Sequence, residues 1–166
     1  MIETNKYELP DNWKTFACSQ ENLIYAYNKF MQFPILFDDD DRGNFKYFCE
    51  TLISANTINF LTGDYGLVII ENVVPFRDAN IHLCFWDRRF KGRDIECKQT
   101  LKWLFDKLSL ERVSVSVPET TKATISFILS LGFKKEGVKR RSYKYKNRFL
   151  DSILFGLLRD DLFKEE

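Results

Sequence analysis

The sequence of 166 residues has few of the features that mark membrane, secreted or metal-binding proteins. No uncharged apolar run reaches the ~18 residues that a membrane-spanning helix needs, so we expect no transmembrane segment. Residues 1–6 are polar and of mixed charge, unlike the start of a secretory signal. The net charge is only +1, so the chain as a whole is not steered toward nucleic acid or an anionic membrane.

Metal ligands and paired cysteines are also scarce. The four cysteines show neither metal-site spacing nor a C-x-x-C motif, and there is a single histidine. A run of four aspartates, residues 38–41, is interpreted as a solvated loop, because few other ligands are available to converge on it. We therefore expect no metal, and reduced, mostly buried thiols in a cytoplasmic protein. The cysteines are Cys18, Cys49, Cys84 and Cys97.

The remaining composition is that of a globular domain. Hydrophobic residues make up 45% and charged residues 30% of the chain, which excludes disorder. A chain of this length buries enough surface for a stable core, so we expect one domain over residues 1–166. Only 7 residues are glycine, so each glycine is expected to have a positional role.

Apolar periodicity predicts two helices in the first third of the chain and two more in the second half. The faces of the first pair hold Leu23, Tyr27, Phe30 and Met31, and then Phe45, Phe48, Cys49 and Leu52. The third face holds Cys97, Leu101, Leu104, Phe105 and Leu108. The fourth helix, begun by Pro118 and ended by Gly132, presents Thr124, Phe127, Ile128 and Leu131.

Runs of β-forming residues predict six strands. They cover residues 57–62, 66–74, 80–86, 112–117, 136–145 and 149–158. Asn147 tolerates the left-handed conformation that the tight turn between the last two strands needs. The order α-α-β-β-β-α-β-α-β-β indicates an α/β (α+β) domain with a mixed, mostly antiparallel twisted sheet and helices on both faces.

The turn of residues 89–94 is the best candidate for a binding site. It leaves a strand and opens a helix, where free backbone N–H groups and the helix dipole attract anions. Gly92 would let a phosphate approach the backbone closely, whereas Asp94 would compete for the same dipole. The alternative is a solvated basic turn capped by Asp94. Positive charge around the turn comes from Arg88, Arg89, Lys91 and Arg93.

Four segments between residues 67 and 158 together resemble one known family. They are residues 89–94 (RFKGRD), 117–123 (VPETTKA), 131–137 (LGFKKEG) and 151–159 (DSILFGLLR), the last preceded by Arg140. They are similar to the R/Q-x-x-G-x-G/A turn, the fourth helix, the GF-x-x-E-G segment and the C-terminal hairpin of the GNAT superfamily of acetyl-CoA-dependent N-acetyltransferases. The hairpin is most like that of the branch that acetylates ribosomal-protein N-termini. The first 60 residues match only as two helices.

The resemblance implies acetyl-CoA as co-substrate and suggests where it lies. The strands at 80–86 and 112–117 would splay apart around the pantetheine arm, and the helix after residue 120 would line the thiol end. The implied contacts to the pantetheine are Phe85, Trp86 and Asp87, and those to the diphosphate are Gly92, Arg93 and Asp94. Lys122 is the implied contact to the adenosine phosphates, with Arg88 and Arg93 as alternatives. The matching turn and helix add Arg89, Lys91 and Thr121.

Three positions depart from the family pattern, so the coenzyme motif is degenerate. Asp94 replaces a Gly or Ala and would repel a diphosphate unless it pairs with a neighbouring arginine. Thr121 stands where an Asn is frequent, and Ile128 where many members have a Tyr that protonates the leaving thiolate. The acid would then be another group, such as water, Tyr143 or Tyr145.

The mechanism that the resemblance implies is direct attack of an amine on the thioester, with a base that takes the amine proton. His82 is the candidate base, because imidazole is the side chain that titrates near neutral pH. It shares a strand face with Cys84 and Trp86. The alternative for His82 is a packing or surface role. Cys84 lacks the basic partner that a nucleophile needs.

The predicted function is acetyl transfer to a primary amine, on a protein N-terminus or a small molecule. One alternative is a catalytically degenerate member of the fold that serves as a structural or binding module in a viral or other large assembly. The oligomeric state is left open, and a homodimer is one alternative.

A further alternative is an RNA-contacting protein, because the last hairpin is rich in basic residues and tyrosines. The positive charge would suit contact with RNA, a ribosomal surface or an acidic protein. The other interpretation is a solvent-exposed edge hairpin whose charges prevent pairing with another chain. The basic residues are Lys134, Lys135, Lys139, Arg140, Arg141, Lys144, Lys146 and Arg148.

Overall fold

The computed structural model describes residues 8–33, 35, 44–87 and 92–164. A seven-stranded sheet runs through this part of the chain in the order β1-β2-β3-β4-β5-β7-β6. Neighbouring strands are antiparallel except β4 and β5, which are parallel. The strands are β1 (Trp13–Thr15), β2 (Ile58–Thr62), β3 (Gly66–Val74), β4 (Asp78–Phe85), β5 (Arg112–Pro118), β6 (Lys134–Tyr145) and β7 (Arg148–Leu158).

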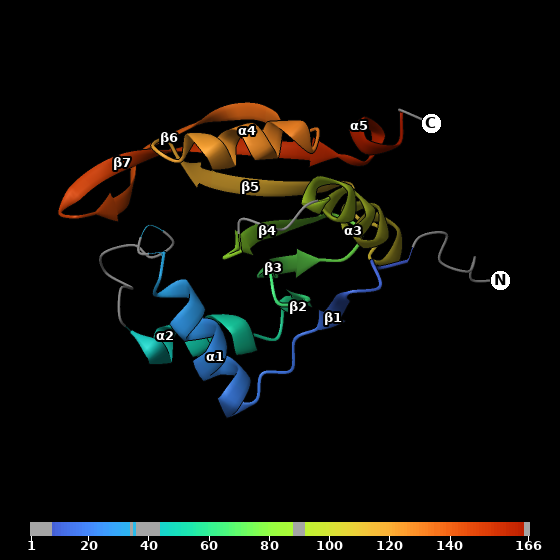
Figure 1. Cartoon of the computed structure of the whole chain (residues 1–166). Coiled ribbons are helices and arrows are strands. Elements are labelled where there is room, and N and C mark those ends of the chain that lie inside the picture. Colours follow the sequence, from blue (N-terminus) through green and yellow to red (C-terminus); the bar gives the residue numbers. More distant parts are fainter. Residues whose placement is uncertain (1–7, 34, 36–43, 88–91, 165–166) are drawn as a thin grey trace.

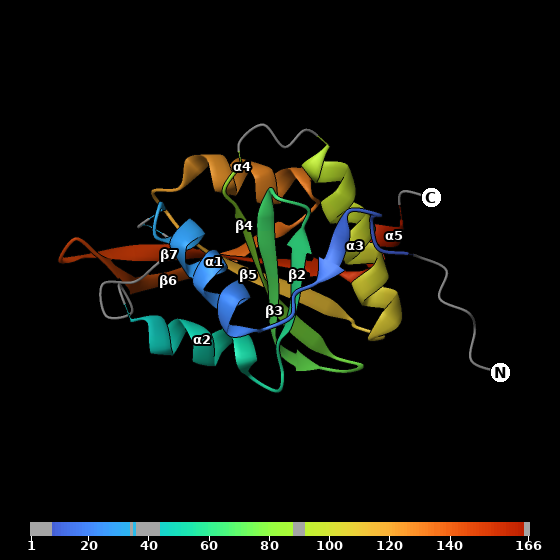
Figure 2. The ribbon, with the colours of Figure 1, turned by 60° about the horizontal axis from the view of Figure 1, so that its bottom comes forward.

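Helices cover both faces of this sheet, α1 and α2 on one and α3 and α4 on the other (Figures 1 and 2). The predicted α/β (α+β) class is therefore confirmed. No helix in the described ranges is long and apolar enough to cross a membrane. The helices are α1 (Gln20–Phe30), α2 (Phe45–Ile53), α3 (Arg93–Lys107), α4 (Lys122–Ser130) and α5 (Arg159–Phe163).

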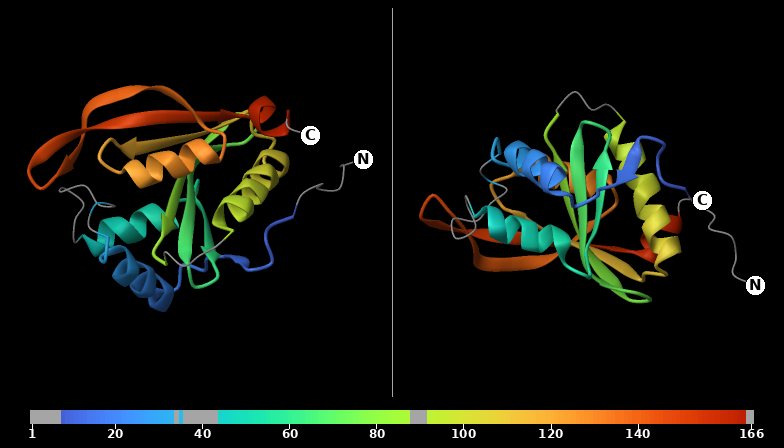
Figure 3. Two further views of the ribbon diagram at one scale, coloured as in Figure 1. Left: turned by 45° about the horizontal axis from the view of Figure 1, so that its top comes forward. Right: turned by 90° about the horizontal axis from the view of Figure 1, so that it is seen from below.

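Strand alternation divides the buried residues into two hydrophobic cores, one on each face of the sheet. On one face Ile81 of β4 packs in the same core as Phe105 of α3. On the other face Ile69 of β3 packs in the same core as Phe48 of α2. The two views of Figure 3 show the two layers of helices on either side of the strands.

The structure differs from the sequence prediction at a few elements. β1 and α5 are additional, and they are only 3 and 5 residues long. α4 begins at Lys122 rather than after Pro118, because Pro118 is still part of β5, where it pairs with Ser152. Met31 ends α1 and is exposed, so it is not on the buried face of that helix.

β6 and β7 form a long hairpin that extends past the rest of the domain (Figure 1). At its tip Lys146 and Asn147 have φ angles of 51° and 57°. Two consecutive left-handed residues make the type of tight turn that matches the twist of antiparallel strands. The predicted turn around Asn147 is therefore confirmed.

Candidate functional site

β4 and β5 start side by side and then part. Their parallel pairing covers only Asp78–Asn80 of β4 and Arg112–Ser114 of β5. β4 nevertheless continues to Phe85, and β5 continues to Pro118. The second halves of the two strands therefore diverge, as the family resemblance implies.

The peptide groups of β4 that face this divergence follow from its pairing with β3. The N–H of Trp86 donates to the carbonyl of Tyr65 at 3.0 Å, so the Trp86 peptide points toward the β3 side. Peptide groups of an antiparallel strand alternate in direction, so those of Leu83 and Phe85 point toward β5. Beyond Asn80 the edge of β4 therefore presents backbone donors and acceptors to the gap.

A cavity of about 340 Å³ lies between the diverging strands. Leu83 and Val115 line it and belong to the core under α3 and α4. His82 and Cys84 also line it, and Cys84 belongs to the core under α1 and α2. The cavity is thus lined from both faces of the sheet, so two reactants arriving from opposite faces would meet in it.

His82 is hydrogen-bonded to a carboxylate at this cavity. Its Nε2 lies 2.9 Å from Oε1 of Glu71 on β3. Glu71 pairs with Asn80, which makes it the diagonal neighbour of His82 on the same face of the sheet. The hydrogen bond from His82 lowers the pKa of Glu71 below its ordinary value, against the opposing effect of burial. Glu71 is therefore an ionised acceptor at neutral pH.

Polar side chains of the long hairpin close the cavity on another side. The Tyr143 hydroxyl donates to the carbonyl of Ile35, in the segment that follows α1. Ser142 and Ser152 join β6 to β7 through their hydroxyls, 2.8 Å apart. Lys139 also lines the cavity and brings positive charge to it.

The N-terminus of α3 has the geometry predicted for an anion site. Gly92 occupies the N-cap position with φ of 77° and provides no side-chain cap. A Cβ atom built on Gly92 would meet nothing within 4 Å. Asp94 is exposed in the first turn. The arrangement leaves space for a phosphate at the first-turn amides, and the carboxylates of Asp94 and Glu96 lie in the same turn.

An aromatic contact joins this helix start to the edge of β4. The rings of Phe85 and Phe127 meet edge to face, with centroids 6.1 Å apart. The Arg93 guanidinium lies 5.2 Å from the centroid of the Phe127 ring. Phe127 of α4 thus packs against β4 and the first residue of α3 together, which fixes the spacing of the three elements around the gap.

One of three comparisons with known proteins found similar proteins. No family model and no curated protein matches the sequence. Among solved structures, a variant of spermidine N-acetyltransferase from Vibrio cholerae superposes with a TM-score of 0.75 at 13% identity, over 93% of this chain and 99% of that one. The chain has the fold of GNAT acetyltransferases.

Two further structures with this fold are similar. Ribosomal-protein-S5-alanine acetyltransferase from Vibrio fischeri has a TM-score of 0.68 at 16% identity, over 93% of this chain and 97% of its own. A GNAT-family acetyltransferase from Bacillus anthracis has a TM-score of 0.66 at 13% identity, over 88% and 93% of the two chains. Identities this low show a shared GNAT fold and not a shared substrate.

The predicted catalytic residues come together in the GNAT fold. His82 and Tyr143 both line the cavity between β4 and β5, and so does Thr121, which was predicted to bind the coenzyme. The Thr121 hydroxyl is engaged locally, since it donates to the carbonyl of Pro118 at 2.7 Å. Ile128, one of the three predicted departures from the family pattern, is 1% exposed and lines the same cavity.

The predicted coenzyme residues are more scattered. The N–H groups of Trp86 and Asp87 both donate to the carbonyl of Tyr65, so of the three predicted pantetheine contacts only Phe85 presents its peptide to the gap. Lys122 is exposed at the start of α4. Gly92, Arg93 and Asp94 form the start of α3, outside the cavity lining. Arg88, Arg89 and Lys91 lie outside the described residues.

Sequence reasoning missed Glu71, Leu83 and Phe127 as parts of the site. Glu71 is the only charged residue in the apolar strand β3, and that interruption was an available signal. The roles of Leu83 and Phe127 depend on register and helix placement, which a single sequence does not reveal.

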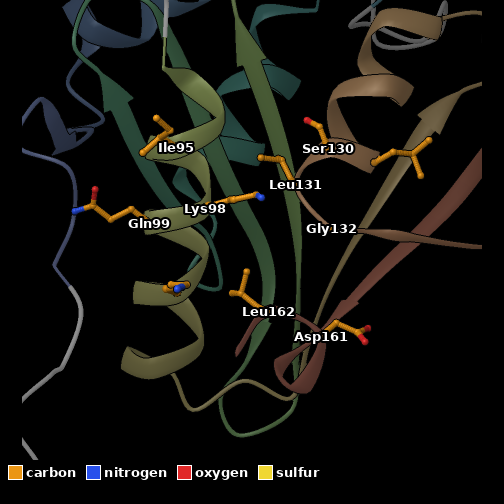
Figure 4. Close-up of a pocket in the computed structure, with 10 residues that line it drawn as sticks. Ile95, Lys98, Gln99, Ser130, Leu131, Gly132, Asp161 and Leu162 are labelled. Atoms are coloured by element: carbon orange, nitrogen blue, oxygen red, sulfur yellow. The ribbon is translucent and has the colours of Figure 1, made fainter. Parts of the chain in front are cut away.

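A second cavity, of about 600 Å³, lies between α3, the end of α4 and α5 (Figure 4). Lys98 of α3 points toward Leu131 in this view, and Gln99, Gly132 and Asp161 also line the cavity. Of the predicted catalytic and coenzyme-binding residues that the structure describes, none lines this cavity. Within the described ranges, no group of three or more His, Cys, Asp or Glu side chains gathers where it could hold a metal ion.

Cys84 is expected to be unreactive although it lines the candidate site. Burial raises the pKa of its thiol to about 12, so the nucleophilic thiolate is nearly absent at neutral pH. Burial also raises the pKa of Cys97. In a thiol-reagent titration at pH 8, we expect Cys84 and Cys97 to react only after unfolding, whereas the less buried Cys18 and Cys49 react in the native protein. Rapid labelling of Cys84 in the native state would contradict this.

Proposed function

We propose that the protein is an acetyl-CoA-dependent N-acetyltransferase that acts on a primary amine. The observation that carries this proposal is the divergence of β4 and β5 around a cavity that His82 lines from one face of the sheet. Acetyl-CoA supplies an activated acyl group as a thioester. The GNAT fold of the structural neighbours supports the assignment.

The chain offers suitable groups for the coenzyme. The edge of β4 at Leu83 and Phe85 supplies peptide groups for the pantetheine amides. Gly92 leaves room for phosphate oxygens at the first-turn amides of α3. Lys122 and Arg93 stand at the starts of α4 and α3 and supply positive charge. Ile128 and Thr121 line the cavity in which the thioester would lie.

His82 then accepts the proton that the attacking amine loses when its nitrogen bonds to the acyl carbon. The carbon–sulfur bond breaks, and the leaving thiolate takes up one proton. Tyr143 is our candidate donor for that proton, because its hydroxyl lies at the same cavity and Tyr145 does not line it. A water molecule is the alternative donor.

Replacing His82 with glutamine should lower kcat by roughly 10²–10⁴-fold, the usual contribution of a general base. The rise in melting temperature on adding coenzyme A should persist, because His82 is on the face opposite to α3 and α4. Release of free thiol from acetyl-CoA measures the rate with a panel of amines that includes spermidine and peptides with an N-terminal alanine. Unchanged turnover in the variant would remove His82 from the mechanism.

The acceptors in this panel come from the names of two structural neighbours, which contain spermidine and ribosomal-protein-S5 alanine. We propose a small amine or a protein N-terminus as acceptor and a reaction in the cytoplasm. All four cysteines are free thiols, which is consistent with that compartment.

The alternative function, a binding module without catalysis, is favoured by Ile128. It is 1% exposed at the position where many relatives have the tyrosine acid, so the site lacks that proton donor. Binding of coenzyme A without turnover on any amine of the panel would support this alternative.

The basic hairpin offers a second partner surface. Lys139, Arg140, Arg141 and Arg148 are exposed along β6 and β7, and residues 137–150 contain no acidic side chain. We propose that this surface contacts RNA or a ribosomal surface when the acceptor is a ribosomal protein. Affinity for RNA should then fall steeply with salt concentration. Absence of RNA binding at low salt would leave the hairpin as a solvated edge.

A further inference from the structure

The contact between Glu71 and His82 is unusual for its surroundings. Glu71 is the only carboxylate of β3, which otherwise reads as an apolar strand. His82 is the only histidine of the chain. The two side chains meet at 2.9 Å on the α1–α2 face, with the histidine lining the cavity and the glutamate behind it. A glutamate that served only as a solvent-exposed polar residue of the strand would not need a histidine partner.

We propose that Glu71 is the positioning residue of the acetyl-transfer site, and that its carboxylate holds the His82 imidazole with Nε2 protonated and Nδ1 as the proton acceptor. The catalytic part of this inference rests on the proposed function. An ionised carboxylate can only accept hydrogen bonds, so the imidazole nitrogen that faces it must carry the hydrogen. The other ring nitrogen is then the one that can take a proton from the amine.

The charge of Glu71 also favours the product of that proton transfer. When Nδ1 takes the amine proton, His82 becomes a cation next to an anion, and opposite charges at this distance stabilise each other. The other titratable groups lining the cavity are Cys84, Tyr143 and Lys139. The Cys84 thiol stays protonated because burial raises its pKa, and a Lys139 cation would oppose a second positive charge. Among the residues that the structure describes, Glu71 is therefore the carboxylate that lies next to His82 and can stabilise its cation.

The first test needs no acceptor. Since the hydrogen bond from His82 lowers the pKa of Glu71, replacing His82 with alanine should move the carboxyl titration of Glu71 to higher pH. The measurement is a pH series of the side-chain carboxyl resonance by ¹³C NMR. A titration that does not move would overturn the contact and with it the inference.

The second test separates positioning from a structural role. Glu71→Gln should lower kcat by about 10- to 100-fold, less than the ~10²–10⁴-fold that the general base itself contributes. KM for acetyl-CoA should stay unchanged. The matched control is Glu50→Gln, which removes an exposed carboxylate paired with Lys46 on α2 and should leave kcat unchanged.

The outcomes distinguish this inference from the proposed function. If Glu71→Gln turns over acetyl-CoA with the wild-type kcat, the positioning role is wrong and the transferase assignment stands. If the wild-type protein does not bind coenzyme A, the transferase assignment fails and so does the catalytic part of this inference. In that case the carboxyl titration still decides whether the two side chains interact.

Discussion

Replacing Gly92 with glutamate should abolish the rise in melting temperature that coenzyme A gives the wild-type protein. At a coenzyme concentration 100 times Kd, binding stabilises the folded state by about 2.7 kcal/mol. For a domain of this size that corresponds to a rise of about 5–10 °C. The glutamate would place a side chain and a negative charge in the open space at the α3 N-terminus, where the phosphates are expected.

The control for this variant is Gly92→Ala. Gly92 has φ of 77°, so any other residue there is strained by about 1–2 kcal/mol, and alanine shares that strain without the charge. Both variants should have lower melting temperatures than the wild type, but only alanine should keep a substantial part of the coenzyme-dependent rise. A full rise in the glutamate variant would show that the coenzyme phosphates do not lie at Gly92.

Replacing Gly66 with alanine should destabilise the fold by about 3 kcal/mol, the upper end of the range for overpacked interiors. Gly66 pairs with Phe85, and a Cβ there would lie 2.6 Å from the Cys84 carbonyl oxygen and 2.9 Å from the Phe85 Cα. These are backbone atoms of β4, so they cannot rotate away as a flexible side chain would. The strand that is pushed aside is the one whose edge forms the candidate coenzyme site.

Chemical unfolding in urea measures this effect, and Gly137→Ala is the matched control. Gly137 also lies in a strand, β6, but a Cβ there would meet nothing within 4 Å. We expect Gly137→Ala to stay within about 0.5 kcal/mol of the wild type. Equal stabilities of the two alanine variants would contradict the close approach of β3 and β4 at Gly66.

The sequence predicted most long elements because their hydrophobic periods are clear. The predicted bounds of β3 agree with the structure, since turn residues at Gly63 and Gly66 mark its start. β1 and α5 were missed because 3 and 5 residues are too few to show a period. The start of α4 was misplaced because Pro118 is a common first helical residue, but here it ends a strand.

The candidate site was less accessible to sequence reasoning than the fold. His82 could be singled out because it is the only imidazole, but its partner could not. Glu71 is 11 positions away and meets His82 only through the register of β3 and β4. The cavity likewise depends on where the β4–β5 ladder stops, at Asn80 and Ser114, and local residue patterns do not specify that point.

Hydrogen–deuterium exchange with and without acetyl-CoA tests the central claim most directly, because it reports where on the chain the coenzyme binds. The account predicts slower exchange at the β4 edge around Leu83 and Phe85 and at the first turn of α3 after Gly92, with no change in α2. Protection confined to the cavity between α3 and α5, or no protection anywhere, would contradict coenzyme binding between the diverging strands.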